Sequence, residues 1–191
     1  MPDVKETNRI YLTYKARIKS EAKLRLFSKL ANFLIIWYSF WMIVVSIAQA
    51  SQIVRVDYFE IILASSSVAI FASSVFLATG IIEKRAGDFR ACYLELQKIY
   101  NSQLSEAQKM KRYADALTRY PNHSSRENAD VILDTWRRGG TLYDTKGEIP
   151  LSWMVWLPAI IRKIVFWLIT ILLFSGPLCI FIVVGATSVG N

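Results

Sequence analysis

Three long stretches without a charged residue constrain this chain more than any other feature of its sequence. They run from Phe33 to Ala50, from Ile61 to Ile82 and from Ile164 to Asn191. Each reaches the roughly 18 to 20 residues that a helix needs to cross about 30 Å of hydrocarbon. A soluble core divided among many short elements would not require such runs. The sequence therefore predicts an all-α membrane protein with three spans, at 33–50, 61–82 and 164–187.

The first stretch has an alternative interpretation as a cleaved signal peptide. Small residues at Ala48 and Ala50 have the spacing that a signal peptidase prefers. About thirty residues precede the stretch, however, and it is longer than the roughly 7 to 15 apolar residues of a signal peptide. We therefore expect the segment to be retained as a membrane anchor.

The distribution of lysine and arginine predicts the orientation. Eight of the 23 basic residues fall in residues 1–32 and fourteen in residues 83–163, whereas the connector from Ser51 to Glu60 holds only Arg55. Because basic loops stay in the cytosol, we expect the N-terminus and residues 83–163 there and the C-terminus outside. The net charge of +8 then meets anionic lipid headgroups, so we expect no direct binding of nucleic acid.

Between the spans, the hydrophobic pattern is helical. One helix is predicted from about Thr7 to Ala50, because no Pro or Gly interrupts a stripe of Ile10, Tyr14, Ile18, Ala22, Leu26 and Leu30. A second stripe follows the second span, at Phe89, Tyr93, Leu96, Tyr100 and Leu104. The first two spans form a hairpin, so we expect the two stripes to pack against each other as an antiparallel pair.

The segment 105–140 predicts two further helices separated by a corner. Ser105 with Gln108 can start the first helix, which must end before Pro121 because proline disfavours helical geometry in the preceding residue. Ser124 and Glu127 have the spacing of a capping box, in which each side chain accepts from the other residue's amide. The second helix is expected to end at Gly139-Gly140.

His123 is the only histidine, and it immediately precedes this second cap. Catalysis would require a partner nucleophile or a fixed carboxylate, and a metal would require further ligands; the neighbouring sequence offers neither. We therefore expect Asn122, His123, Ser124 and Glu127 to form a structural corner, with a ligand or partner contact as the open alternative. Cys92 and Cys179 fall in different compartments and predict neither a disulfide nor a zinc site. We expect no cofactor.

The second span carries small residues every four positions, at Ser65, Ala69 and Ser73. Small residues let helices approach closely in lipid, so this face predicts packing against the first span or against another copy. A second interpretation is that the serine hydroxyls line a narrow water path in an oligomer. Three spans are too few to enclose a wide channel, and conduction would therefore require a homo-oligomer, expected to be a symmetric ring.

Aromatic and basic residues precede the third span, and a Gly-Pro pair lies within it. Trp153, Trp156, Arg162 and Lys163 are the residue types expected at a headgroup interface. We predict an interfacial segment at 151–163, interrupted near Pro158, that lies on the inner leaflet. Gly176 and Pro177 predict a kink within the span, either static or acting as a hinge.

The arrangement of these parts resembles a known family. A two-helix membrane hairpin, then a basic helix with Arg85, Phe89, Tyr93 and Leu96, then the Asn-His-Ser motif is similar to the SLATT domains, most closely a subfamily with that motif. SLATT domains are SMODS and SLOG-associating two-transmembrane effectors of bacterial defence systems. The resemblance covers roughly residues 5 to 185. An Asp is more usual in the family where Glu127 stands, and either carboxylate can cap a helix.

The resemblance implies a single SLATT-like domain over residues 1–191, in the inner membrane of a bacterium. It implies an effector that permeabilises or depolarises that membrane when a cytosolic sensor of the same anti-phage system activates it, causing growth arrest or death. The alternative is a non-conducting scaffold that recruits a cytosolic enzyme through its helical stalk. A membrane enzyme is not expected, because the spans contain no paired carboxylates or polar triads.

Overall fold

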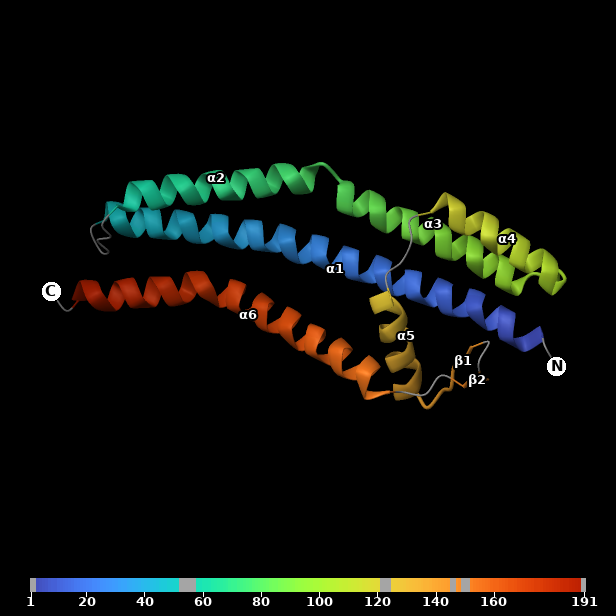
Figure 1. Cartoon of the computed structure of the whole chain (residues 1–191). Helices are drawn as coiled ribbons and strands as arrows, with labels where there is room; N and C mark the ends of the chain where they lie inside the picture. Colours follow the sequence, from blue (N-terminus) through green and yellow to red (C-terminus); the bar gives the residue numbers. More distant parts are fainter. Residues whose placement is uncertain (1–2, 52–57, 121–124, 145–146, 149–151, 190–191) are drawn as a thin grey trace. The chain divides into compact units, whose positions relative to one another are not determined.

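The computed structural model describes residues 3–51, 58–120, 125–144, 147–148 and 152–189, and this part of the chain is helical apart from one tiny hairpin (Figure 1). The helices are α1 (Asp3–Ala50), α2 (Phe59–Ala78), α3 (Ile81–Asn101), α4 (Glu106–Arg119), α5 (Ser125–Arg137) and α6 (Trp153–Val189). Strands β1 (Tyr143–Asp144) and β2 (Gly147–Glu148) pair antiparallel, with Tyr143 opposite Glu148. The predicted all-α class is confirmed.

Three of the described helical regions are long and apolar enough to cross a membrane. They lie within Arg9–Ala50, Glu60–Asn101 and Trp156–Cys179. Each contains or overlaps one of the three charge-free stretches. The predicted count of three spans therefore agrees with the helices that the chain forms.

Helix α2 stops at Ala78, before the predicted end of the second span at Ile82. The amide of Thr79 still donates to the carbonyl of Val75, but Gly80 adopts a φ of +67° and the next helix begins at Ile81. A left-handed φ is strained for residues with a side chain and costs glycine little. Gly80 therefore separates α2 from α3.

The predicted interruption near Pro158 is wrong, because α6 runs without a break from Trp153 to Val189. The first turn of the helix precedes Pro158, and in it the amide of Trp156 donates to the carbonyl of Ser152 at 3.2 Å. Pro158 follows closely after this first turn and removes one backbone hydrogen bond from a helix of 37 residues. Residues 153–163 therefore belong to the same helix as the third span, and their place at the inner leaflet stays a prediction.

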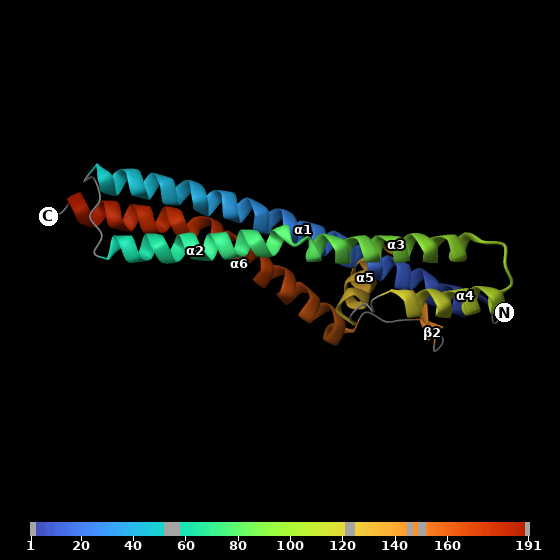
Figure 2. The same cartoon turned by 90° about the horizontal axis from the view of Figure 1, so that it is seen from above.

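The chain divides into two compact units. The polar unit contains residues 1–26 and 82–163, and the apolar unit contains residues 27–81 and 164–191. Helices α1 and α6 contribute residues to both units. In the apolar unit, the later part of α1 runs alongside α2 and alongside the later part of α6 (Figure 2).

The core of the polar unit confirms that the two stripes face each other. Ile10 and Tyr14 of α1 are buried against Leu96 and Ile99 of α3. Helix α4, which the stripes did not anticipate as a partner, adds Tyr113 and Ala116 to the same cluster. Its start agrees with the prediction, since the amide of Ser105 donates to Oε1 of Gln108 at 3.3 Å. Three helices therefore enclose this core.

The predicted stripe on α1 is wrong beyond Ile18. Ala22 and Leu26 are exposed, whereas Arg17 and Glu21 are buried. A repeat of four residues advances 40° per step around a helix of 3.6 residues per turn, so it leaves the buried face after a few steps. The positions that stay on that face carry polar side chains, which a hydrophobic pattern does not reveal.

Leu96 and Leu94 provide a matched test of this core. Leu96 is fully buried and Leu94 is 44% exposed on the same helix. We expect Leu96→Ala to lower the free energy of unfolding of the polar unit by about 3 kcal/mol, because it leaves a cavity. Leu94→Ala should change it by less than about 0.5 kcal/mol. Amide hydrogen exchange of α3 in the full chain measures both, and equal effects would contradict the described core.

Candidate functional site

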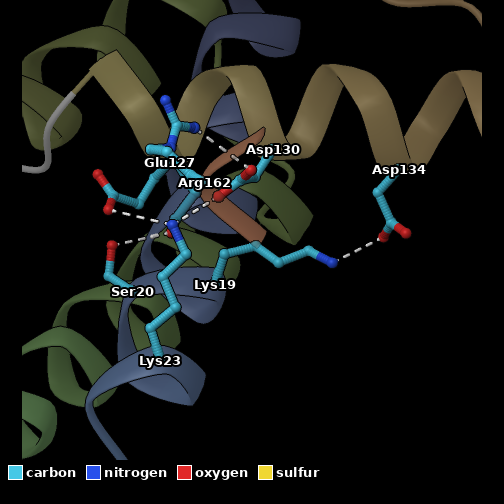
Figure 3. A network of polar contacts seen from close by, with 8 residues as sticks. Lys19, Ser20, Lys23, Glu127, Asp130, Asp134 and Arg162 are labelled. Atoms are coloured by element: carbon cyan, nitrogen blue, oxygen red, sulfur yellow. Dashed lines mark hydrogen bonds and ion pairs between the residues drawn. The ribbon is translucent and has the colours of Figure 1, made fainter. Parts of the chain in front are cut away.

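Helix α5 makes several ion pairs with its neighbours. Carboxylates of Glu127, Asp130 and Asp134 recur at spacings of three and four residues, so they share one face of the helix. Opposite them, α1 offers Lys19 and Lys23, which are also four residues apart. Figure 3 shows both lysines pointing toward the carboxylates, and we call these five residues with Arg162 the α5 ionic cluster.

Asp130 is the centre of the cluster. Its side chain is only 6% exposed, and it joins Lys23 of α1 at 2.5 Å to Arg162 of α6 at 3.6 Å. Lys23 also lies 3.5 Å from Glu127. A buried carboxylate must be paired, because removing a charge from water without compensation is costly. Asp130 therefore fastens α1, α5 and α6 together inside the polar unit.

Asp134 makes the second link between α1 and α5. Lys19 Nζ donates to its Oδ2 at 2.8 Å, and Arg138 lies 3.3 Å from the same oxygen. The hydrogen bond from Lys19 holds the pKa of the Asp134 carboxyl below its usual 3.8. The carboxylate is therefore charged at neutral pH, and α5 engages both Lys19 and Lys23 of α1.

Within the described residues, no group of three or more His, Cys, Asp or Glu side chains is arranged to hold a metal ion. The carboxylates of α5 face cations instead. Of the predicted corner, Asn122, His123 and Ser124 lie outside the described residues, and the role of His123 stays a prediction. Glu127 is described, and it contacts Lys23.

The end of α5 agrees with the sequence prediction. Gly139 has a φ of +73°, its amide donates to the carbonyl of Trp136, and the amide of Gly140 donates to that of Thr135. This pair of hydrogen bonds around a left-handed glycine is a Schellman motif. It ends α5 after Arg137, as expected from Gly139-Gly140.

The family-like residues of α3 have unequal environments. Phe89 and Leu96 are buried in the polar unit, and Arg85 is exposed. Tyr93 is half-buried and hydrogen-bonds to Glu21 of α1. Three of the four therefore contribute to packing α3 against its neighbours, and Arg85 remains available at the surface.

The predicted interfacial anchors also differ in their exposure. Trp153 is 63% exposed and Lys163 is exposed, but Trp156 is half-buried. Arg162 approaches Asp130 and belongs to the α5 ionic cluster. The sequence pattern detected the charge of Arg162 but not its partner, which comes from another helix.

The small-residue face of α2 is exposed in the single chain, at Ser65, Ala69 and Ser73. Ala69 and Ser73 also border an apolar groove of about 580 Å³ in the apolar unit. The opposite wall comes from α1, and it includes Ala31 and Tyr38. The first two spans therefore leave an open seam beside the small residues, and the pore interpretation stays a prediction.

The predicted kink site at Gly176-Pro177 lies beside hydrogen-bond donors of α1 that the sequence did not identify. The Tyr38 hydroxyl donates to the carbonyl of Leu173 at 2.9 Å, and Trp37 Nε1 donates to the carbonyl of Phe174 at 3.0 Å. Both acceptors lie one turn before Pro177. The sequence did indicate an unsatisfied acceptor, because Pro177 has no N–H to donate to the carbonyl of Leu173 four residues earlier.

Acid should weaken the polar unit through Asp134. A carboxyl whose pKa is lowered on folding stabilises the folded state above its unfolded value, and this contribution is lost as pH falls through the lower folded value. We therefore expect wild type to have a higher Tm than Asp134→Asn at pH 7. The difference should disappear at the acid end, well below pH 3.8. A difference that persists unchanged in acid would show that charge is not the cause.

Comparison with known proteins gives one match. A family model described as SMODS and SLOG-associating 2TM effector domain family 5 covers residues 3–183. Neither the curated proteins nor the solved structures contain a match. The family description counts two transmembrane segments, whereas the described chain has three helices that could span, the third within α6.

Proposed function

Since this chain belongs to the SMODS and SLOG-associating 2TM effector domain family 5, we propose that it is a membrane-embedded effector of bacterial anti-phage defence. On activation it permeabilises or depolarises the inner membrane and stops growth. The family match over residues 3–183 carries this proposal, and three helices capable of spanning support the membrane location. The chain acts by changing the membrane and not by catalysis.

The active form is a homo-oligomer. In lipid no hydrophobic effect drives helices together, so close approach at small residues and shape complementarity must do so. The exposed face of Ser65, Ala69 and Ser73, with the groove beside it, offers both. A neighbouring copy that seats a helix there would place serine hydroxyls at the interface, where a water path can form.

The α5 ionic cluster receives the activating signal. The basic polar unit is cytosolic, as the positive-inside bias requires, and it therefore meets the sensor protein. Helices α1 and α6 both continue as unbroken helices into the apolar unit. A partner that displaces α5 releases α1 from α6 at Asp130, and each released helix contains a span.

Induced expression in bacteria with a membrane-potential dye tests this function, followed by dye release from liposomes that contain the purified chain. Depolarisation, growth arrest and leakage are expected once oligomers form. Absence of leakage from liposomes that hold oligomeric protein would exclude the permeabilising function. A scaffold would then be favoured, and the exposed cleft between α3 and α4, lined by Glu95, Lys98, Arg112 and Arg119, would be its first docking candidate.

A further inference from the structure

Pro177 leaves a backbone acceptor of α6 without its usual donor. In an α-helix the carbonyl of Leu173 accepts from the amide four residues later, and proline has no N–H to give. Leu173 lies in a charge-free span, where an unsatisfied carbonyl has no water to replace the lost hydrogen bond. Another side chain must therefore compensate for the proline.

Tyr38 of α1 makes this compensation, and the adjacent Trp37 adds a second hydrogen bond to α6. Tyr38 donates to the carbonyl of Leu173 at 2.9 Å, and Trp37 donates to that of Phe174 at 3.0 Å. The ring of Phe174 also lies 5.5 Å from that of Phe33 and 6.4 Å from that of Trp37, centroid to centroid. The first and third spans are thus joined by directional hydrogen bonds as well as by packing.

Gly176 lies beside the Tyr38 hydroxyl. A Cβ atom built on Gly176 would lie 3.5 Å from the Tyr38 hydroxyl, which is an ordinary van der Waals contact. Glycine beside proline also lowers the resistance of a helix to bending. The hydrogen bonds from α1 therefore meet α6 at the position where that helix changes shape most easily.

We propose that Trp37 and Tyr38 form a polar latch that holds the Gly176-Pro177 hinge of α6 in the resting, non-conducting arrangement. This inference rests on the proposed function and names how that function is restrained. Activation withdraws the two donors, the hinge bends, and the leak path opens. Interhelical hydrogen bonds in membranes shift an equilibrium roughly three- to fifteenfold each, which is small enough for a partner to overcome.

A double-mutant cycle in proteoliposomes of the full chain tests the latch. Tyr38→Phe keeps the ring and removes the donor, so the unprompted leak rate should rise about three- to fifteenfold. Pro177→Ala returns an amide to the Leu173 carbonyl. In that background Tyr38→Phe should change the leak less than about twofold, because the acceptor no longer depends on the tyrosine.

Two controls separate the latch from general damage. Tyr58→Phe removes the same hydroxyl from a tyrosine that is 79% exposed, and it should leave the leak at the wild-type rate. Trp37→Phe is the second latch variant and should raise the leak as Tyr38→Phe does. Circular dichroism checks that each variant keeps its helical content. If either Tyr38→Phe or Trp37→Phe has lost helicity, the other variant is used to test the latch.

The outcomes distinguish this inference from the function on which it rests. If wild type leaks at a high protein-to-lipid ratio and both latch variants leak at the wild-type rate, the latch is overturned and the effector function stands. Additive effects of Tyr38→Phe and Pro177→Ala would also overturn it. If no variant leaks at any ratio, the effector function fails, and the latch as its restraint fails with it.

Discussion

Asp130→Asn is expected to loosen α5, because it removes the ion pair with α6 and one of the ion pairs with α1. The asparagine fits the same space but removes the charge that faces Lys23 and Arg162. Breaking a buried ion pair from one side costs up to about 3 to 5 kcal/mol when the remaining charge has no other partner, but Lys23 keeps Glu127 at 3.5 Å. Because Lys23 is 47% exposed, we expect about 2 to 3 kcal/mol. The loss should appear as roughly 30- to 150-fold faster amide exchange in residues 125–137.

Asp115→Asn is the matched control for this prediction. It makes the same change on an exposed carboxylate of α4, and it should alter exchange by less than about threefold. Exchange in α5 that is the same in Asp130→Asn as in wild type would show that the cluster does not hold the helix. Under the proposed function, Asp130→Asn should also depolarise cells without an activating partner.

Ser73→Leu is expected to abolish depolarisation of induced cells. Ser73 is exposed on α2 and borders the groove, so a leucine there fills the space that a neighbouring helix needs. It also removes a hydroxyl from the expected water path. The effect should be a loss of at least about tenfold in the rate of depolarisation, because close contact of small residues is a main source of helix association in lipid.

Ser67→Leu tests whether position matters. Ser67 is also exposed on α2, but at 100° per residue it lies about 120° around the helix from Ser73. It should depolarise cells at the wild-type rate and insert in the membrane at the same level on a blot. Loss of activity in both serine variants would indicate a general defect in α2. Full activity in Ser73→Leu would remove this face from the oligomer interface.

The spans and the caps were readable in the sequence because each depends on local composition. A run without charges predicts a membrane helix wherever it occurs, and Phe33 to Ala50 is one such run. Gln108 caps the start of α4, and Gly139 ends α5, through contacts within a few residues. The break at Gly80 was equally local, but a glycine in an otherwise helical pattern does not by itself reveal which φ it adopts.

The contacts that form the candidate site were not readable in the same way. Lys23 pairs with Asp130 across more than one hundred residues, and nothing in either local sequence names the other as its partner. The drift of the α1 stripe after Ile18 hid the buried polar face on which Arg17 and Glu21 lie. Pro177 predicted a missing donor, but only the packed bundle identified Tyr38 as the donor that replaces it.

The sequence by itself determined the membrane class, the number of spans, the helical character of the polar unit and the family. These follow from hydropathy, capping residues and motif order, which act over one helix or one turn. Tertiary structure alone decided which charges of α1 meet α5, that Arg162 joins Asp130, and that Tyr38 of α1 replaces the hydrogen bond lost at Pro177. Such pairings depend on the rotation and register of helices that pack together although they are far apart in the sequence. Many residues jointly set that geometry.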